Sequence, residues 1–237
     1  MLEEIMRAGA AAMGIGMTEA QAGQFARYHA LLTEANRRFN LTRVPDDPRE
    51  AADRNYLDSI SVLAQGVPET GEAIDVGSGA GFPGIPLAIM LPELRFTLLD
   101  SLAKRVDFLQ SVIDALGLRA VALHMRAEDA ARMPELRERF DLALARAVAP
   151  MNLLSELLLP FVKVGGYMLA MKGPGLDEEL ETAQHAVRLL GGRVERTAAL
   201  PIPGRDWDHR AVWICKAAPV SEKYPRPAGI PQKRPLR

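Results

Sequence analysis

The sequence predicts an α/β protein built on a mostly parallel, seven-stranded sheet with helices on both faces. Three observations predict it. From about residue 73, short apolar segments alternate with segments of helical periodicity, which is the order of βαβ units. The first apolar segment leads directly into a glycine-rich loop. The last two apolar segments have no helical segment between them, so we expect them to close the sheet as an antiparallel pair.

A helical extension is predicted to precede the sheet, over residues 1–68. Its clearest helix starts at Thr18, where Thr18 and Gln21 have the spacing of a capping box. One face of that helix is apolar, with residues three and four apart at Phe25, Tyr28, Leu32, Ala35 and Phe39. A second helix is expected to begin at Pro48, because proline favours the first turn, and to end near Leu63.

The main domain is predicted over residues 69–217. Strands are expected at 73–76, 95–100, 120–124, 140–145, 164–171, 194–200 and 211–216. Helices are expected to begin near Gly84 and to cover 102–116, 153–161 and 177–190. The helix over 102–116 stops at Gly117 and the helix over 177–190 stops at Gly191, because glycine is typical of the residue just after a helix.

The last segment, residues 218–237, is predicted to be a separate tail. From Lys216 to Arg237 there are six Lys or Arg residues, five prolines and a single acidic residue, Glu222. Such a segment is too polar and too rich in proline to build a core. Two interpretations remain open: a solvated terminus, or an extended arm that lies on a polyanion.

The overall charge and the cysteine content exclude several classes of protein. The formal net charge is −1, so any nucleic acid must be bound by a local basic patch. The single cysteine, Cys215, can form neither an internal disulfide nor a cysteine metal cluster. The four histidines have no metal-ligand spacing. With no secretory leader and no membrane-spanning apolar run, we expect a cytoplasmic protein without a metal.

A glycine-rich loop follows the first strand, after Asp75. Gly77, Gly79, Gly81 and Gly84 follow at close spacing, which allows tight turns and a close approach of the backbone to a ligand. Open α/β sheets bind ligands at this carboxyl edge, where the next helix points free N–H groups at them. The loop lacks the Gly-Lys-Ser/Thr end of a P-loop and the spacing of a dinucleotide fingerprint. A purely structural turn remains an alternative.

Two acidic residues beyond the loop narrow the ligand to a nucleoside. Asp100 ends the second strand, where a carboxylate can accept both hydrogen bonds of a ribose diol. It also precedes a helix, so a helix cap is the alternative. Ala127 and Glu128 follow the third strand, where an adenine ring would lie and an acid could accept from its amine. Here a helix start is the alternative.

Longer motifs make the chain similar to one family. They are Asn40-Leu-Thr42, Leu57-Asp-Ser59, the loop from Asp75 to Pro86, the segment from Leu98 to Val106, Ala145-Arg-Ala147, Met171-Lys-Gly173 and the tail from Lys223 to Leu236. Over almost its whole length the chain resembles the RsmG family, also called GidB. The runs Gly-Phe-Pro-Gly-Ile-Pro at 81–86 and Asp-Ser-Leu-Ala-Lys-Arg at 100–105 are the most specific of these elements.

The resemblance implies a class I, Rossmann-like methyltransferase that uses S-adenosyl-L-methionine (SAM). Members of the family methylate N7 of a guanine in a conserved loop of 16S ribosomal RNA, near the decoding centre. By resemblance, the cofactor would be held by Asp75, Gly77, Gly79 and Phe82, by Asp100 at the ribose, by Ala127 and Glu128 at the adenine, and by Arg146 beside the methionine or the RNA. Cations on the RNA side would be Lys104, Arg105, Arg126, Lys172 and Arg210.

One position departs from the family pattern. Family members commonly carry His two residues before Leu-Asp-Ser, where this chain has Asn55. Asn55 could replace the hydrogen bonding of that histidine but not its charge. The resemblance leaves open whether naked RNA or the assembled small subunit is the substrate, and we expect a monomer.

The residue content suits transfer to N7. Guanine N7 is a neutral lone pair that attacks the sulfonium methyl directly, so neither a general base nor a covalent intermediate is needed. The protein must align the reactants, with Arg146 in a positioning role, and alignment can contribute about 7–11 kcal/mol of the barrier. Side chains cannot reach N7 inside an A-form helix. The target must therefore lie in a loop, where Phe82, Lys104, Arg105 and the basic tail would meet phosphates and bases.

Two other functions stay open at this point. A nicotinamide-dependent oxidoreductase would also use a glycine-rich loop, but the glycine spacing disfavours it. A non-catalytic RNA-binding module could keep the same fold, although the cofactor motifs look intact.

Overall fold

The computed structural model describes residues 1–38, 41–146 and 148–236. Phe39, at the end of the predicted apolar stripe, lies outside the described residues, as do Asn40 and Ala147 from two of the motifs, and Arg237. Within the described residues, no helix has both the length and the apolar character that a membrane crossing requires.

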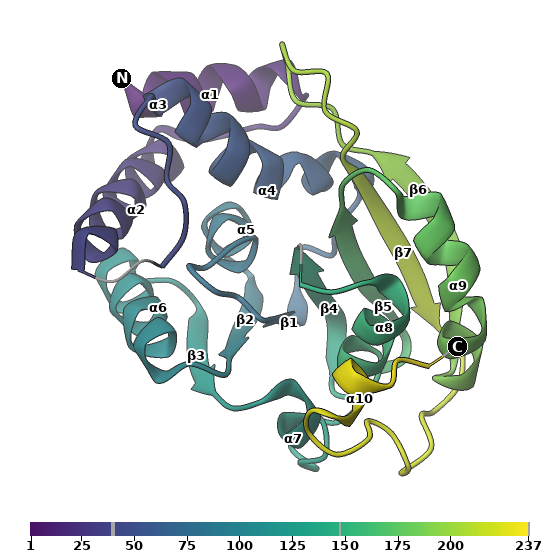
Figure 1. Ribbon diagram of the computed structural model, residues 1–237. Helices are drawn as coiled ribbons and strands as arrows, with labels where there is room; N and C mark the ends of the chain where they lie inside the picture. Colours follow the sequence, from purple (N-terminus) through teal and green to yellow (C-terminus); the bar gives the residue numbers. More distant parts are fainter. Residues whose placement is uncertain (39–40, 147, 237) are drawn as a thin grey trace.

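A seven-stranded sheet forms the centre of the protein, in the order β3-β2-β1-β4-β5-β7-β6 (Figure 1). Its strands are β1 (Gly71–Val76), β2 (Leu94–Asp100), β3 (Ala120–His124), β4 (Phe140–Arg146), β5 (Val162–Lys172), β6 (Gly192–Ala199) and β7 (Arg210–Lys216). The first five pair in parallel, and β7 runs antiparallel to both β5 and β6. The predicted fold class and its antiparallel closing pair are confirmed. Because β7 is reversed, its first residue, Arg210, pairs with the last residue of β5, Lys172.

Helices cover both faces of the sheet. They are α5 (Gly84–Met90), α6 (Ala103–Leu116), α7 (Ala127–Ala130), α8 (Met151–Leu158), α9 (Leu176–Leu189) and the C-terminal α10 (Ile230–Lys233). Successive strand residues point to opposite faces, so Ala73 of β1 packs in the core with α5 and α6. Its neighbour Ile74 packs in the core with α8 and α9. The alternation of strands and helices read from the sequence therefore corresponds to two separate hydrophobic cores.

The N-terminal extension is helical, as predicted, and packs on the face covered by α5 and α6. Its elements are α1 (Leu2–Ala12), α2 (Glu19–Arg38), α3 (Pro48–Ala51), a π-helical turn η1 (Ala52–Leu57), α4 (Asp58–Ile60) and a 3-10 turn η2 (Ser61–Gln65). The capping box of α2 is confirmed, because the Thr18 amide donates to Gln21 Oε1 over 2.9 Å and the Gln21 amide donates to Thr18 Oγ1 over 3.2 Å. The helix predicted from Pro48 begins there, but the π-turn interrupts it.

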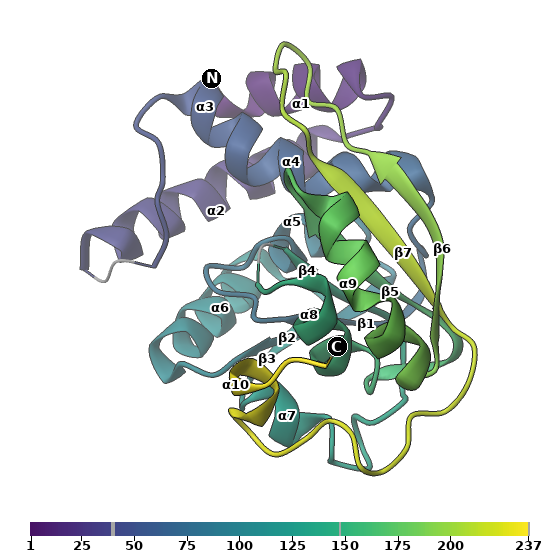
Figure 2. The ribbon, with the colours of Figure 1, turned by 45° about the vertical axis from the view of Figure 1, so that its right-hand side comes forward.

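The tail is bound to the domain along its course below α7 and α8 (Figure 2). The Arg137 guanidinium donates to the carbonyls of Val220 and Tyr224, each over 2.8 Å, and Pro231 in α10 is buried. The described part of the tail is therefore docked on the domain, which corrects the interpretation as a solvated terminus, whereas contact of its exposed side with a polyanion stays a prediction. Composition did not reveal the docking because side chains distant in the sequence, among them Arg137 and Glu156, bind the backbone of the tail.

Candidate active site

The glycine-rich loop between β1 and α5 packs against the side chain of Asp75. The Gly84 amide donates to Asp75 Oδ2 over 3.0 Å, and a Cβ at Gly84 would lie 2.6 Å from the same oxygen. Gly81 has a φ of +105°, and a Cβ there would lie 2.7 Å from the Tyr28 hydroxyl oxygen. Both positions therefore require glycine. At Gly84 a side chain would be too close to Asp75, and at Gly81 the positive φ also disfavours any other residue.

Asp75 lies beneath the loop rather than among the residues that line the cavity above it. Its side chain is fully buried, and Oδ1 has no hydrogen-bond partner among the described residues. Burial raises the pKa of this carboxyl to about 7, against the lowering effect of the Gly84 amide. Asp75 thus holds the loop, whereas its predicted contact with a cofactor stays a prediction.

A cavity of about 510 Å³ opens above the loop at the carboxyl edge of the sheet, which is within the usual size of cofactor sites. Seven residues predicted to hold the cofactor line it: Gly77, Gly79, Phe82, Asp100, Ala127, Glu128 and Arg146. Two cations predicted for the RNA side, Arg105 and Arg126, also line this cavity. The structure therefore gathers residues that follow four different strands at one edge, as expected for an open parallel sheet.

Asp100 is held in place by the backbone around it. Its Oδ2 accepts from the Gly79 amide over 2.9 Å, and its Oδ1 accepts from the Leu102 amide over 3.0 Å. Arg105 Nη1 approaches Oδ2 at 3.4 Å. The carboxylate therefore holds the backbone just before α6 and also borders the cavity; its contact with a ribose stays a prediction.

Glu128 borders the same cavity from the short helix α7 and is 4% exposed. Its Oε1 accepts from the Gly229 amide over 2.9 Å and from the Arg126 guanidinium over 3.2 Å. Burial acts to raise the pKa of this carboxyl, but these hydrogen bonds outweigh it and leave the pKa below its usual value. The lowered pKa favours the carboxylate form of Glu128, in which both oxygens can accept hydrogen bonds.

The Phe82 ring is enclosed between the N-terminal helices and an arginine. Its centroid lies 5.7 Å from the ring centroids of both Tyr28 and Tyr56, and the Arg146 guanidinium lies 4.9 Å from it. With 7% of its surface exposed, the ring is not the open platform for RNA bases that the sequence predicted. It instead supports Arg146 through a cation–π contact.

Arg146, the last residue of β4, is fixed by groups of the N-terminal extension. Its Nη1 donates to Asp58 Oδ2 over 2.7 Å and to the Arg54 carbonyl over 3.1 Å. Arg54 belongs to η1, and π-turns of this kind occur frequently at functional sites. Asp58 Oδ1 lies 2.7 Å from His209 Nδ1, just before β7. The hydrogen bond to Asp58 raises the pKa of His209.

A second cavity, of about 330 Å³, adjoins the first, because Arg146 lines both. Its lining residues are Arg54, Asp58, Arg146, Met171, Lys172, Gly173, Leu200 and His209. The sequence assigned no role to Arg54, Asp58 or His209. The only signal for them was the Leu57-Asp-Ser59 motif, which contains Asp58. We refer to the two as the cofactor cavity and the acceptor cavity.

Comparison with known proteins decides the family. The family model described as rRNA small subunit methyltransferase G matches residues 21–206. A protein named ribosomal RNA small subunit methyltransferase G from Lactobacillus johnsonii is 45% identical over 241 residues, with 100% of each chain covered. A protein of that name from Thermoanaerobacter pseudethanolicus is 44% identical over 235 residues, with 98% of each chain covered.

The chain belongs to the rRNA small subunit methyltransferase G family. It is a SAM-dependent methyltransferase, so the oxidoreductase and the non-catalytic module are set aside. Solved structures of other proteins support the fold. Fibrillarin from Aeropyrum pernix with bound SAM has a TM-score of 0.54 at 17% identity, over 69% of this chain and 75% of that chain. A SAM-dependent methyltransferase from Aquifex aeolicus has a TM-score of 0.53 at 21% identity, over 71% and 93%.

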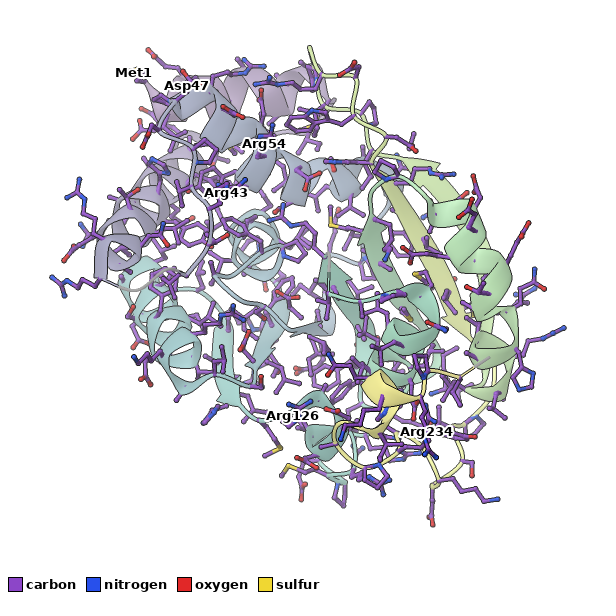
Figure 3. The ribbon with its side chains drawn as sticks, in the orientation of Figure 1. Met1, Arg43, Asp47, Arg54, Arg126 and Arg234 are labelled. Atoms are coloured by element: carbon purple, nitrogen blue, oxygen red, sulfur yellow. The ribbon has the colours of Figure 1, made fainter. Side chains whose placement is uncertain are left out.

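The cations predicted for the RNA side of this methyltransferase G family member lie in three places. Arg105 and Arg126 lie at the cofactor cavity, and Figure 3 shows Arg126 beside α7. Lys104 lies beside Arg38 of α2 in another groove. Lys172 and Arg210 lie beside α9, where Lys172 Nζ lies 2.7 Å from Glu179 and Arg210 Nη1 lies 3.0 Å from Asp177. Their contact with RNA stays a prediction.

Asn55, the departure from the family pattern, lies in η1 and is buried. Its Nδ2 has no hydrogen-bond partner among the described residues. Its carbonyl oxygen lies 3.5 Å from Arg146 Nη1. In this member of the methyltransferase G family, the residue thus reaches Arg146 through its backbone oxygen, and its side chain carries no charge.

Proposed function

We propose that the protein transfers a methyl group from SAM to N7 of a guanine in a conserved loop of 16S ribosomal RNA, near the decoding centre. The observation that carries the proposal is the state of Asp58, the carboxylate of the acceptor cavity. Its two oxygens are engaged by Arg146 and by His209, each at 2.7 Å. Asp58 is therefore committed to holding cations and is poorly placed to remove a proton. This suits N7, which attacks through a neutral lone pair and needs no base.

The donors and acceptors of the cofactor cavity fit SAM. The Asp100 carboxylate would accept from the ribose hydroxyls, and Glu128 would accept from the adenine amine beside Ala127. Gly77 and Gly79 would let the methionine part approach the backbone. The cofactor, when bound, supplies the sulfonium methyl group. Arg146, on the wall common to both cavities, would hold the acceptor in line with it, which is the main catalytic contribution expected here.

The acceptor cavity fits one nucleotide turned out of an RNA loop. Met171 and Leu200 offer apolar walls for a base, and Arg54 and Arg146 offer positive charge for its phosphate. A loop nucleotide can be splayed out in this way, whereas N7 inside an A-form duplex is out of reach. We therefore propose small-subunit ribosomal RNA, naked or in the assembled subunit, as the partner, and the cytoplasm as the place of action.

A methylation assay tests the proposal. The protein is incubated with labelled SAM and, in parallel, with small subunits or naked RNA from a strain that lacks this methylation. The RNA is then digested and the modified nucleoside identified by mass spectrometry. We expect the label on N7 of one guanine. Label on another atom, or no label on either substrate, would contradict the proposal, and label on only one substrate would decide between the two.

A further inference from the structure

The C-terminal tail reaches the cofactor cavity through one residue, Glu128. The Gly229 amide donates to Glu128 Oε1 over 2.9 Å, and Glu128 lines the cavity. The other partner of this carboxylate is Arg126 at 3.2 Å, whose side chain is about half exposed, at 48%. Both donate to Oε1, and Oε2 takes part in neither bond. The tail therefore supplies one of the two bonds that orient the Glu128 side chain, and it donates this bond from its backbone.

The tail is anchored on both sides of this contact. Before it, the buried carboxylate of Glu156 in α8 accepts from the Arg226 amide over 2.8 Å and from the Arg226 guanidinium over 2.6 Å. After it, Asn152 Nδ2 donates to the Leu236 carbonyl over 3.0 Å. Figure 1 shows the tail running alongside α7 to reach α10, which is in contact with α8. Gly229 is thus held between two fixed points on α8.

The helices that the tail joins are themselves walls of the cofactor cavity. Ala127 and Glu128 of α7 line it, and so does Leu157 of α8, the residue after Glu156. The α7 helix is only four residues long, and a helix this short has little stability of its own. Its place must come from its neighbours, and the tail is one of them.

We propose that the C-terminal tail is a working part of the cofactor site, in which Arg226 and Gly229 position the Glu128 carboxylate for the adenine amine of SAM. The inference rests on the placement of adenine at Glu128 proposed above. Arg226 and Gly229 are positioning residues, since they act through Glu128 and touch no reacting atom. By linkage, SAM binding stabilises the docked tail by the same factor as the docked tail strengthens SAM binding.

The first test measures the dissociation constant of SAM by calorimetry on the full chain. We expect Arg226→Gln to raise it about tenfold, because loosening the tail next to Gly229 weakens the hydrogen bond that Gly229 donates to the Glu128 carboxylate. Lys223→Gln is the matched control, because it removes the same charge from an exposed position of the same tail, and we expect a change under about twofold. Steady-state kinetics should show a higher KM for SAM in Arg226→Gln with kcat nearly unchanged.

A double-mutant cycle separates positioning from a general loss of structure. Glu128→Gln alone should weaken SAM binding, and Arg226→Gln should then add little to it. An equal effect of Arg226→Gln with and without Glu128→Gln would overturn the inference, as would wild-type affinity in Arg226→Gln. If Glu128→Gln binds SAM normally, the adenine placement fails and the inference fails with it. The variant combining Glu156→Gln with Arg226→Gln leaves no buried charge unpaired, and it replaces the single variant if that does not fold.

Hydrogen exchange on the unmodified protein supplies an independent readout. Saturating SAM should slow amide exchange in peptides covering residues 226–233, together with the loop over residues 77–82. Protection of the loop with no change in the tail would overturn the inference.

Discussion

Asp58 Oδ1 lies 2.7 Å from His209 Nδ1, although 151 positions separate the two residues in the chain. The other oxygen of the same carboxylate lies 2.7 Å from Arg146 Nη1. One side chain of the N-terminal extension therefore joins the end of β4 to the start of β7. The extension is thus part of the acceptor cavity as well as a cover for the sheet.

Asp58→Asn should release Arg146 and lower kcat. A misplaced positioning group can cost on the order of 100-fold in rate. Asp53→Asn is the matched control, because Asp53 is equally buried and bridges Arg49 and Arg205 without touching Arg146. Both variants should lower the melting temperature, but only Asp58→Asn should lower kcat strongly in methylation assays. Equal losses of kcat would show that the effect comes from stability alone.

His209 should make the protein less stable as the pH rises. The hydrogen bond that His209 donates to Asp58 raises the pKa of His209 in the folded protein. The stability this pair contributes is therefore fully present below the unfolded pKa of about 6.5 and is lost as the pH rises through the folded value. Melting temperatures at pH 6 and pH 9 check this, with His209→Gln for comparison. The deficit of His209→Gln should be larger at pH 6, and an equal deficit at both would contradict the assignment.

Asp75→Asn should gain stability relative to wild type as the pH rises. Burial raises the folded pKa of Asp75 from 3.8 to about 7, so wild type loses stability as the pH rises from about 4 to 7. A tenfold change in a proton-binding constant corresponds to about 1.4 kcal/mol, and asparagine has no such titration. The free energy of unfolding of Asp75→Asn minus that of wild type, from urea titrations, should be a few kcal/mol more positive at pH 8 than at pH 4. A pH-independent difference would rule out the raised pKa.

Gly81→Ala should weaken SAM binding about tenfold or more. Its Cβ would lie 2.6 Å from Ile85 Cγ1, so the loop that borders the cofactor cavity must shift. Gly14→Ala isolates this effect, because Gly14 also has a positive φ, +73°, but no atom lies within 4 Å of its added Cβ. Calorimetry should find normal SAM affinity in Gly14→Ala. A similar affinity for SAM in Gly81→Ala and Gly14→Ala would show that crowding at Gly81 does not weaken SAM binding.

The cofactor cavity could be predicted from the sequence because its lining residues come at or just after the ends of successive strands. In a parallel sheet, residues just after each strand meet at one edge, and this brings Asp100, Glu128 and Arg146 together. The same reasoning could not find the Asp58–His209 pair. That contact depends on how the N-terminal extension packs on the sheet and on the direction of β7, and neither leaves a periodic signal in the sequence.

The burial of particular polar and aromatic residues also could not be predicted from the sequence. Phe82 looked available for RNA, but Tyr28 and Tyr56 enclose it from two separate helices. The tail looked unable to pack, but Arg137 and Glu156 hold it through its backbone and through Arg226. In both cases the partners are far apart in the sequence, so composition and spacing within the segment carry no information about them.

The reversed direction of β7 determines which loop borders the acceptor cavity. Because β7 runs against β5, residues 201–209 arrive at the carboxyl edge, and His209 enters the acceptor cavity. If β7 were parallel to β5, its start, and His209 with it, would lie at the opposite edge of the sheet. Residues 201–209 lie between β6 and β7, apart from the strands β1, β2 and β4 whose ends line the cofactor cavity. Changes in the length or side chains of this loop can therefore leave the glycine-rich turn between β1 and α5 in place.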